Sequence, residues 1–246
     1  MRRRSALQLG AGAAASLMTW GCMPLVRNKQ RLNILLICVD DLNHWVGHLN
    51  TPQRAFTPWI DKLAARGTSF VHAYCPAPYC NASRMAVFTG INPSTSGIYQ
   101  DEPYWDTPRR RLTFFEAARN NHYYLYGAGK IFHGRYDYAS AQAKNLHAAS
   151  WLDLENRPWV WDGFEAMQPE QLPQLFPSNR LKEDSSGKPW SAQFDWGVLP
   201  DEAEDQHPDV LTASSIVRFL ARPPRQPFLC VAGFYKPHLP WYAPRR

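Results

Sequence analysis

Three continuous apolar runs place the strongest constraint on the fold of this chain. They cover residues 32–39 (LNILLICV), 123–129 (YYLYGAG) and 227–235 (PFLCVAGFY). Uninterrupted runs of this length, rich in β-branched and aromatic residues, are typical of strands that are buried on both faces of a parallel sheet. A further run, residues 68–74 (TSFVHAY), predicts another strand.

Helical patterns separate these runs. Residues 57–67 begin with a threonine N-cap followed by proline and end at a glycine, and residues 113–121 open with the Thr-x-x-Glu spacing of a capping box. Residues 207–224 predict a third helix that ends at a proline. Its predicted buried stripe consists of Val210, Ala213, Val217 and Leu220. The alternation predicts an α/β sandwich in which helices flank a largely parallel central sheet.

Residues 134–206 interrupt this alternation. They are rich in proline and polar residues, and a segment of this length is often a lid or a wall that faces the substrate. Packed surface loops with aromatic plugs explain the composition equally well. The tryptophans of this insertion are Trp151, Trp159, Trp161, Trp190 and Trp196.

The first 30 residues carry most of the excess positive charge. The chain has 27 basic and 21 acidic side chains, but five of the basic ones and none of the acidic ones lie in residues 1–30, which leaves a net charge of +1 for the rest. No basic stripe remains that would indicate a nucleic-acid partner.

The composition of residues 1–30 is that of an export signal followed by a linker. An arginine cluster, an alanine-rich apolar run and small residues ending at Cys22 follow one another in the order of such a signal, with features of a twin-arginine leader and a lipoprotein box. We therefore expect the export machinery as a partner and Cys22 as a candidate lipid anchor. The expected location is the periplasm or the outer side of the cytoplasmic membrane.

The segment CPAPYCNASRMAVFTG, residues 75–90, contains a cysteine whose role the rest of the chain must decide. Cys80 directly precedes a run of small residues that predicts a helix, and Arg84 follows four residues later. A disulfide partner, a metal ligand, a thiol nucleophile and buried filler are all open roles for Cys80. No activating base is adjacent in sequence for the thiol nucleophile. Cys38 and Cys230 lie inside apolar runs and are predicted core residues.

Polar side chains follow three of the predicted strands. Asp40 and Asp41 come after the first, and adjacent carboxylates suit Ca²⁺ or Mg²⁺, although such a pair also occurs in solvated turns. Because ligand sites in α/β sheets lie at the carboxyl ends of strands, these residues predict a cation beside positive groups that could hold a tetrahedral oxyanion. The positive groups are two pairs: Lys130 with His133, and Lys236 with His238.

The segment Cys80-Asn81-Ala82-Ser83-Arg84 resembles the sulfatase signature Cys-x-Pro/Ala-x-Arg, in its alanine form. VDDLN, FTGINPSTSGIY, GKIFHG and YKPHLPW also resemble, in the expected order, motifs of the iduronate-2-sulfatase branch and its bacterial relatives. The resemblance runs from about residue 31 to the end of the chain. It implies the alkaline-phosphatase-like fold, with residues 31–246 as the N-terminal part of a sulfatase catalytic domain.

The resemblance also implies how the site works. A maturation enzyme oxidises Cys80 to formylglycine, whose hydrate attacks the sulfur of a sulfated sugar or glycosaminoglycan-type ester. Asp40, Asp41 and the modified Cys80 are implied ligands of Ca²⁺, with Mg²⁺ as the alternative ion. The implied role of Arg84 is to hold the modified residue. The residues that the resemblance implies to contact the sulfate or protonate the leaving oxygen are Lys130, His133 and His238.

Family members run to several hundred residues and supply a further Asp, a His or Asn and a Lys from their second half. Because this chain stops at WYAPRR, we expect a fragment or a truncated product whose fold is incomplete at the C-terminus. Two other functions fit the pattern. One is a phosphate or phosphonate ester hydrolase of the same superfamily, and the other is an inactive glycan-binding remnant that binds through the Trp-rich insertion.

Overall fold

A computed structural model describes most of the chain beyond residue 30. The described residues are 31–100, 102, 111–133, 161–165, 196–199, 201–239 and 241–245. The predicted export signal with Cys22 and most of the insertion at 134–206 lie outside these residues. Among the described helices, none is both long and apolar enough to cross a membrane.

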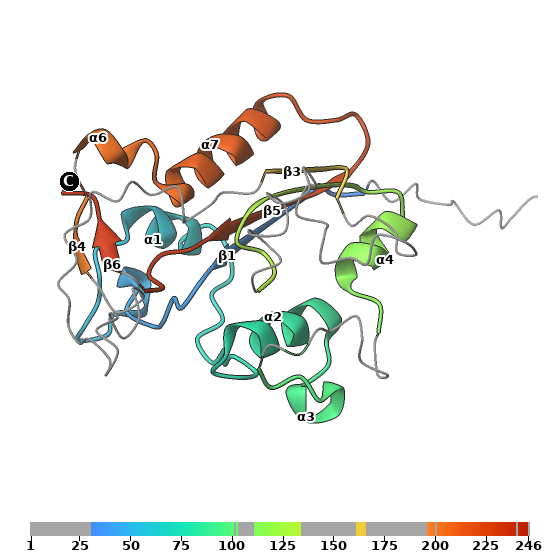
Figure 1. Ribbon diagram of the computed structural model, residues 1–246, viewed down its shortest axis with the longest axis horizontal. Helices are drawn as coiled ribbons and strands as arrows, with labels where there is room; N and C mark the ends of the chain where they lie inside the picture. Colours follow the sequence, from blue (N-terminus) through green and yellow to red (C-terminus); the bar gives the residue numbers. More distant parts are fainter. Residues whose placement is uncertain are drawn as a thin grey trace, which may run out of the picture. The chain divides into compact units, whose positions relative to one another are not determined.

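A parallel sheet of four strands, in the order β1-β5-β2-β3, forms the centre of the described fold (Figure 1). Its strands are β1 (Ile34–Val39), β5 (Phe228–Phe234), β2 (Tyr124–Gly129) and β3 (Gly163–Glu165). β1, β5 and β2 confirm the strands predicted from the three apolar runs. A second, two-stranded parallel sheet consists of β4 (Trp196–Val198) and β6 (Trp241–Ala243).

Helices cover both faces of the four-stranded sheet (Figure 1). On one face α7 (Pro208–Ala221) packs against β5 and β2, and on the other α4 (Phe114–Asn120) packs against β2 and α2 (Cys80–Thr89). The predicted fold class is therefore confirmed. The remaining helical segments are η1 (Gly47–Leu49), α1 (Pro58–Ala64), α3 (Pro93–Ser96) and α6 (Asp201–Glu204).

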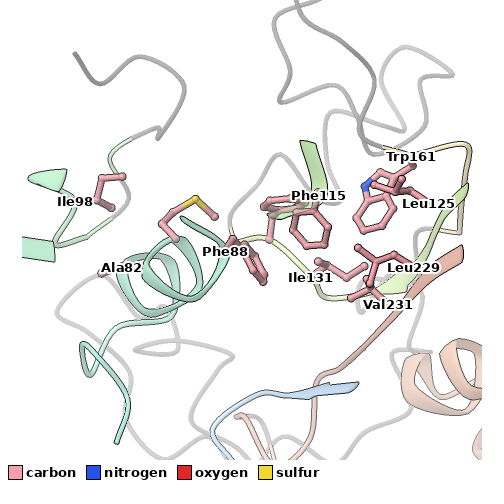
Figure 2. Packing of buried hydrophobic residues seen from close by; sticks show 11 residues of the cluster. Ala82, Phe88, Ile98, Phe115, Leu125, Ile131, Trp161, Leu229 and Val231 are labelled. Atoms are coloured by element: carbon pink, nitrogen blue, oxygen red, sulfur yellow. The ribbon is translucent and has the colours of Figure 1, made fainter. Parts of the chain in front are cut away.

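Two apolar clusters lie on the two faces of the sheet. Side chains alternate along β5, so Leu229 and Val231 belong to one cluster and Cys230 to the other. Burial raises the pKa of the Cys230 thiol to about 11, which confirms it as an inert core residue. Trp161 is buried in the first cluster (Figure 2), so this tryptophan of the insertion is an aromatic plug.

Two predictions about strands are wrong. Residues 68–74 form no strand, and Phe70 and Tyr74 are 79% and 85% exposed. Residue types that favour an extended backbone do not specify the neighbouring strand that must pair with it. β1 is not buried on both faces either, because in the described sheet it is an edge strand that leaves Ile34, Leu35 and Ile37 about half exposed.

The predicted buried stripe of α7 is wrong in its second half, whereas Val210 and Ala213 are half-buried. Val217 and Leu220 are exposed, whereas Thr212 and Ser215 are completely buried. The helix approaches the sheet so closely that a Cβ atom placed on Gly129 would lie 2.6 Å from the Thr212 Oγ1. The packed face therefore combines small side chains with Ile216, and the apolar count of the predicted stripe does not select this side of the helix.

Candidate active site

The carboxyl ends of β1, β5 and β2 lie side by side and bring three predicted site segments together. The backbone ladder continues one residue beyond the strands on both sides of β5. Asp40 N–H donates to the carbonyl oxygen of Phe234 (3.0 Å), and Lys130 N–H donates to that of Gly233 (2.9 Å). Sheet pairing alone thus sets the backbones of Asp40 and Lys130 on the two sides of β5.

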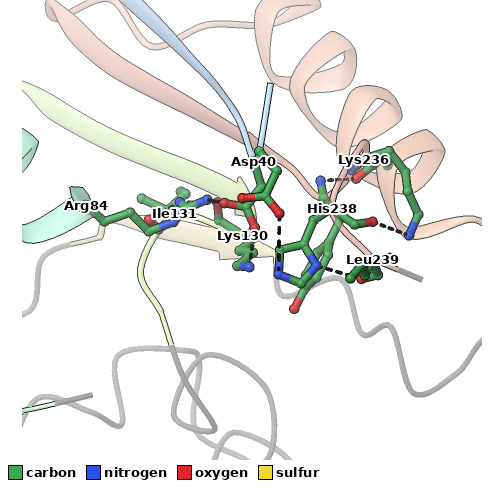
Figure 3. A network of polar contacts seen from close by, with 10 residues as sticks. Asp40, Arg84, Lys130, Ile131, Lys236, His238 and Leu239 are labelled. Atoms are coloured by element: carbon green, nitrogen blue, oxygen red, sulfur yellow. Dashed lines mark hydrogen bonds and ion pairs between the residues drawn. The ribbon is translucent and has the colours of Figure 1, made fainter. Parts of the chain in front are cut away.

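Asp40 is the buried centre of an ion-pair network (Figure 3). Its Oδ1 accepts a hydrogen bond of 2.8 Å from Nη2 of Arg84, and its Oδ2 pairs with Nζ of Lys130. Nη1 of Arg84 donates to the carbonyl oxygens of Lys130 (2.9 Å) and Ile131 (2.5 Å). Arg84 therefore ties α2 to the ends of β1 and β2.

The charges of this network hold Asp40 ionised. Burial acts to raise the pKa of the Asp40 carboxyl, but the charges and hydrogen bonds of Arg84 and Lys130 outweigh burial and keep that pKa below its ordinary value. A buried carboxylate with two cationic partners is therefore an anion at neutral pH.

The lowered pKa of Asp40 predicts an acid-sensitive contribution to stability. The stabilisation is complete above the ordinary carboxyl value of 3.8 and is lost as the pH falls through the lower pKa of the folded state. We expect the stability difference between the wild type and Asp40→Asn to shrink as the pH is lowered from about 5 to about 2. Urea unfolding of both proteins over this range measures it, and a difference that does not change with pH contradicts it.

Cys80 is the first residue of α2. Its neighbour Tyr79, the N-cap, is extended (φ −136°, ψ 130°), so the chain enters the helix at the site and places the positive end of the helix there. Burial raises the pKa of the Cys80 thiol. The charge of Lys130 lowers it in part, whereas the charges of Asp40 and Asp41 raise it further. A thiol kept protonated is a poor nucleophile, which counts against the thiol-nucleophile interpretation.

The described cysteines, among them Cys80 and Cys75, are free thiols. A disulfide at Cys80 is therefore not formed with another described cysteine.

His238 presents Nε2 to the site. Its Nδ1 lies 2.6 Å from the carbonyl oxygen of Leu239, which can only accept, so Nδ1 carries the hydrogen of the neutral ring and Nε2 keeps its lone pair. Nε2 lies 3.9 Å from Oδ2 of Asp41, whose backbone takes a left-handed conformation (φ 56°) that aspartate tolerates. Asp40, Cys80 and His238 each offer one ligand atom, and these atoms all lie within 4.8 Å of one another.

The donor set fits a hard divalent cation better if residue 80 carries oxygen. The carboxylates of Asp40 and Asp41 are donors of the kind that Ca²⁺ and Mg²⁺ take, and each oxygen of Asp40 has a second lone pair beyond its hydrogen bond. The sulfur of Cys80 is a soft donor that suits Zn²⁺ or Cu⁺ instead. Conversion of this cysteine to an oxygen-bearing residue would remove the mismatch.

The model of the family described as "Sulfatase" matches residues 32–246. The chain belongs to the sulfatase family. A curated sulfatase from Formosa agariphila is 32% identical over 228 residues, and iduronate 2-sulfatase from Mus musculus is 26% identical over 217 residues. Each alignment covers 87% of this chain but 40% and 36% of the relative, so this sulfatase chain spans about two fifths of their length.

Solved structures confirm the sulfatase and alkaline-phosphatase-like fold. The phosphonate monoester hydrolase of Agrobacterium radiobacter matches with a TM-score of 0.58 at 20% identity, over 87% of this chain and 43% of that one. A structure described as a complex with its substrate D-glucosamine-2-N,6-O-disulfate matches with a TM-score of 0.52 at 15% identity, over 85% of this chain and 35% of that one.

The other predicted sulfatase-site residues lie close to this centre in different ways. The ring of His133 packs against Tyr79, with 5.6 Å between ring centroids, which places it beside the start of α2. Nζ of Lys236 donates to the carbonyl oxygen of His238 (3.1 Å), so Lys236 supports the turn that carries the histidine.

Sequence reasoning missed two residues that shape the candidate site. Nζ of Lys130 lies 4.5 Å from the ring centroid of Tyr235, a cation–π contact. Both carboxylate oxygens of Asp209 accept backbone hydrogen bonds from the turn after β5. The position of Tyr235 at the end of a predicted strand was an available signal. Asp209 gives no separate signal, because an acidic residue in the first turn of a helix is ordinary.

Proposed function

We propose that the complete protein is a sulfuric ester hydrolase that removes sulfate from a sulfated sugar or glycosaminoglycan-type substrate, with Cys80 converted to formylglycine. The observation that carries this proposal is the position of Cys80. It starts α2 with its ligand atom within 4.8 Å of those of Asp40 and His238, in a chain of the sulfatase family. The relative named iduronate 2-sulfatase and the sugar-disulfate complex support the substrate class.

The proposed chemistry uses two groups that the chain would acquire. A hydrated formylglycine at residue 80 supplies an oxygen nucleophile for the sulfur and a second hydroxyl, whose proton is lost when sulfate is released and the aldehyde reforms. A divalent cation, Ca²⁺ or Mg²⁺, supplies Lewis-acid stabilisation of the developing negative charge. Asp40, Asp41 and residue 80 would hold this cation.

The side chains of the network would hold and neutralise the sulfate group. Lys130 is buried beside Asp40, and the charge of its ammonium reaches Cys80, so it can stabilise charge on the sulfate oxygens in a water-poor site. We propose that His238, once protonated at Nε2, contacts the sulfate or gives that proton to the leaving oxygen, while its Nδ1–H stays bonded to the carbonyl oxygen of Leu239. We propose His133 for the leaving oxygen and Arg84 as the residue that holds the modified residue 80, since the Arg84 guanidinium already bonds Asp40 and the carbonyl oxygens of Lys130 and Ile131.

We expect mass spectrometry to find the aldehyde at residue 80 when the protein is made in a host with a formylglycine-generating enzyme. The tryptic peptide that ends at Arg84 also contains Cys75, which lies outside the signature and should stay a thiol. Cys75 is thus an internal control for non-specific oxidation. An unmodified thiol at Cys80, in a host that converts another sulfatase, would remove the nucleophile from the proposed mechanism.

Phosphonate or phosphate ester hydrolysis is the second candidate function. The structural likeness to a phosphonate monoester hydrolase favours it, because these esters and sulfate esters share a tetrahedral oxyanion. A panel of matched sulfate, phosphate and phosphonate esters decides between them by kcat/KM. We expect the sulfate ester to be preferred, and a preference for the phosphorus esters would transfer the proposal to that class.

We also propose export to the periplasm or to the outer side of the cytoplasmic membrane, with Cys22 as a lipid anchor. This proposal rests on residues 1–30 alone. Cell fractionation of the wild type and Cys22→Ala tests it. Recovery of both proteins in the cytoplasm would contradict export.

A further inference from the structure

Asp209 joins the first turn of α7 to the turn that follows β5. Its Oδ1 accepts a hydrogen bond from the backbone N–H of Tyr235 (2.6 Å), and its Oδ2 accepts one from the N–H of Lys236 (2.9 Å). One carboxylate thus holds two consecutive peptide units. We propose that Asp209 is a positioning residue of the sulfatase site that acts through this turn on Lys130 and His238, an inference that rests on the proposed function.

The turn held by Asp209 carries or covers groups of the site (Figure 3). The ring of Tyr235 lies 4.5 Å from Nζ of Lys130 and 5.8 Å from the ring of His238. The backbone N–H of His238 donates to the carbonyl oxygen of Tyr235 (2.9 Å), and the histidine ring is then fixed by Leu239. A shift of the backbone at Tyr235 would therefore move a packing partner of Lys130 and the Nε2 of His238 together.

The side chain of Asp209 is available to the turn after β5 because another residue accepts the hydrogen bond of the Asp209 backbone N–H. Nδ1 of His207, the N-cap of α7, accepts from the N–H of Asp209 (3.1 Å). Acidic residues near a helix start commonly bond to N–H groups of their own helix. Here both side-chain oxygens reach another segment, and the helix end serves as an anchor for the turn after β5.

The geometry of the site is sensitive to a small displacement of the turn after β5. The ligand atoms of Asp40, Cys80 and His238 lie within 4.8 Å of one another, so a movement of about 1 Å at His238 changes the geometry around the reacting sulfur. Misplacement on that scale, caused by a change outside the chemistry, can cost up to about 100-fold in rate. An effect of this kind lowers kcat more than it raises KM, because the misplaced groups act in the transition state.

The decisive experiment compares Asp209→Ala and Asp209→Asn with Glu165→Gln in the complete protein. Glu165 is a matched control: it is an acidic residue that also joins α7 to the sheet, through Arg218 Nη2 (2.8 Å) and the hydroxyl of Tyr126 (2.9 Å), but it does not touch the turn. We expect kcat to fall about 10- to 100-fold in Asp209→Ala, with a smaller change in KM. Asp209→Asn should retain an intermediate kcat, because its amide oxygen keeps one acceptor, and Glu165→Gln should stay within about twofold of the wild type.

Amide hydrogen exchange supplies a readout that needs no turnover. In Asp209→Ala the peptide spanning residues 234–239 should exchange at least about tenfold faster, while protection in β2 stays at the wild-type level. If the wild type hydrolyses no sulfate ester, the proposed function fails, and hydrogen exchange alone tests whether Asp209 holds the turn after β5. Unchanged protection of Tyr235 and Lys236 in Asp209→Ala would then overturn the proposal. If the wild type is active, a kcat of Asp209→Ala equal to that of Glu165→Gln overturns the positioning role.

Discussion

We expect Asp40→Ala to abolish turnover by the complete protein and to destabilise its fold. Asp40, Arg84 and Lys130 are all buried, with exposures of 6%, 8% and 3%. Removal of the shared carboxylate leaves two positive charges without their partner, and breaking a buried pair in this way costs about 3–5 kcal/mol. Loss of even an outer partner of a metal ligand costs about 10- to 100-fold, so loss of a proposed ligand should lower kcat/KM by more than about 100-fold.

Asp41→Asn separates the proposed cation site from the stability of the fold. The side chain of Asp41 is 54% exposed, and asparagine tolerates the left-handed backbone at this position. We therefore expect the free energy of unfolding to change by no more than about 0.5 kcal/mol, while cation affinity and turnover fall.

Urea unfolding, calcium titration and kcat/KM, measured on the wild type and both variants, test these two expectations. Wild-type turnover in Asp41→Asn would show that Asp41 is only a turn residue. Full stability of Asp40→Ala would show that Arg84 and Lys130 do not depend on this carboxylate.

The central strands could be predicted from local sequence. The same holds for the clustering of the polar segments that follow β1, β2 and β5. β1, β2 and β5 are long apolar runs, and such a run is typical of a strand in a parallel sheet, even though β1 is half exposed in the described sheet. The capping box of α4 is present as predicted, because Thr113 and Glu116 satisfy each other's backbone N–H groups within four residues. Since parallel strands end at one edge, polar residues just beyond them come together without further information.

The features that sequence reasoning missed depend on long-range packing. The buried face of α7 is set by its close approach to Gly129, which no periodicity in residues 207–224 reveals. The short strand β3 pairs with β2 although it lies within a segment that reads as loops. The bonds of Asp209 to Tyr235 and Lys236 join residues that lie 26 and 27 positions apart, so the chemistry of Asp209 becomes visible only in the fold.

The described fold leaves apolar side chains of β1 and α1 open to solvent. On β1, Leu35 and Ile37 lie on one face and are 45% and 48% exposed, and the outer edge of this strand has no partner in the described sheet. The helix α1 has no buried residue, and its Trp59 and Leu63 are 76% and 63% exposed. Apolar surface of this extent, together with an unpaired strand edge, is typical of a surface that another segment or molecule covers.

We expect the 246 residues expressed by themselves to self-associate, to bind an apolar dye and to show no sulfatase turnover. We expect no turnover because Asp40, Asp41 and residue 80, the oxygen ligands proposed among the described residues, supply fewer protein oxygens than the six to eight ligands that Ca²⁺ takes. The double variant Leu35→Lys, Ile37→Lys should reduce association, since lysines on an edge strand oppose pairing. Val87→Lys is the matched control, because Val87 is 55% exposed on α2, whose buried side chains belong to the cluster on the opposite face of the sheet from Leu35 and Ile37, and it should leave association unchanged. Light scattering, dye fluorescence and a sulfate-ester assay measure these outcomes, and a monomeric, dye-negative and active chain would show that these residues complete the site and need no cover.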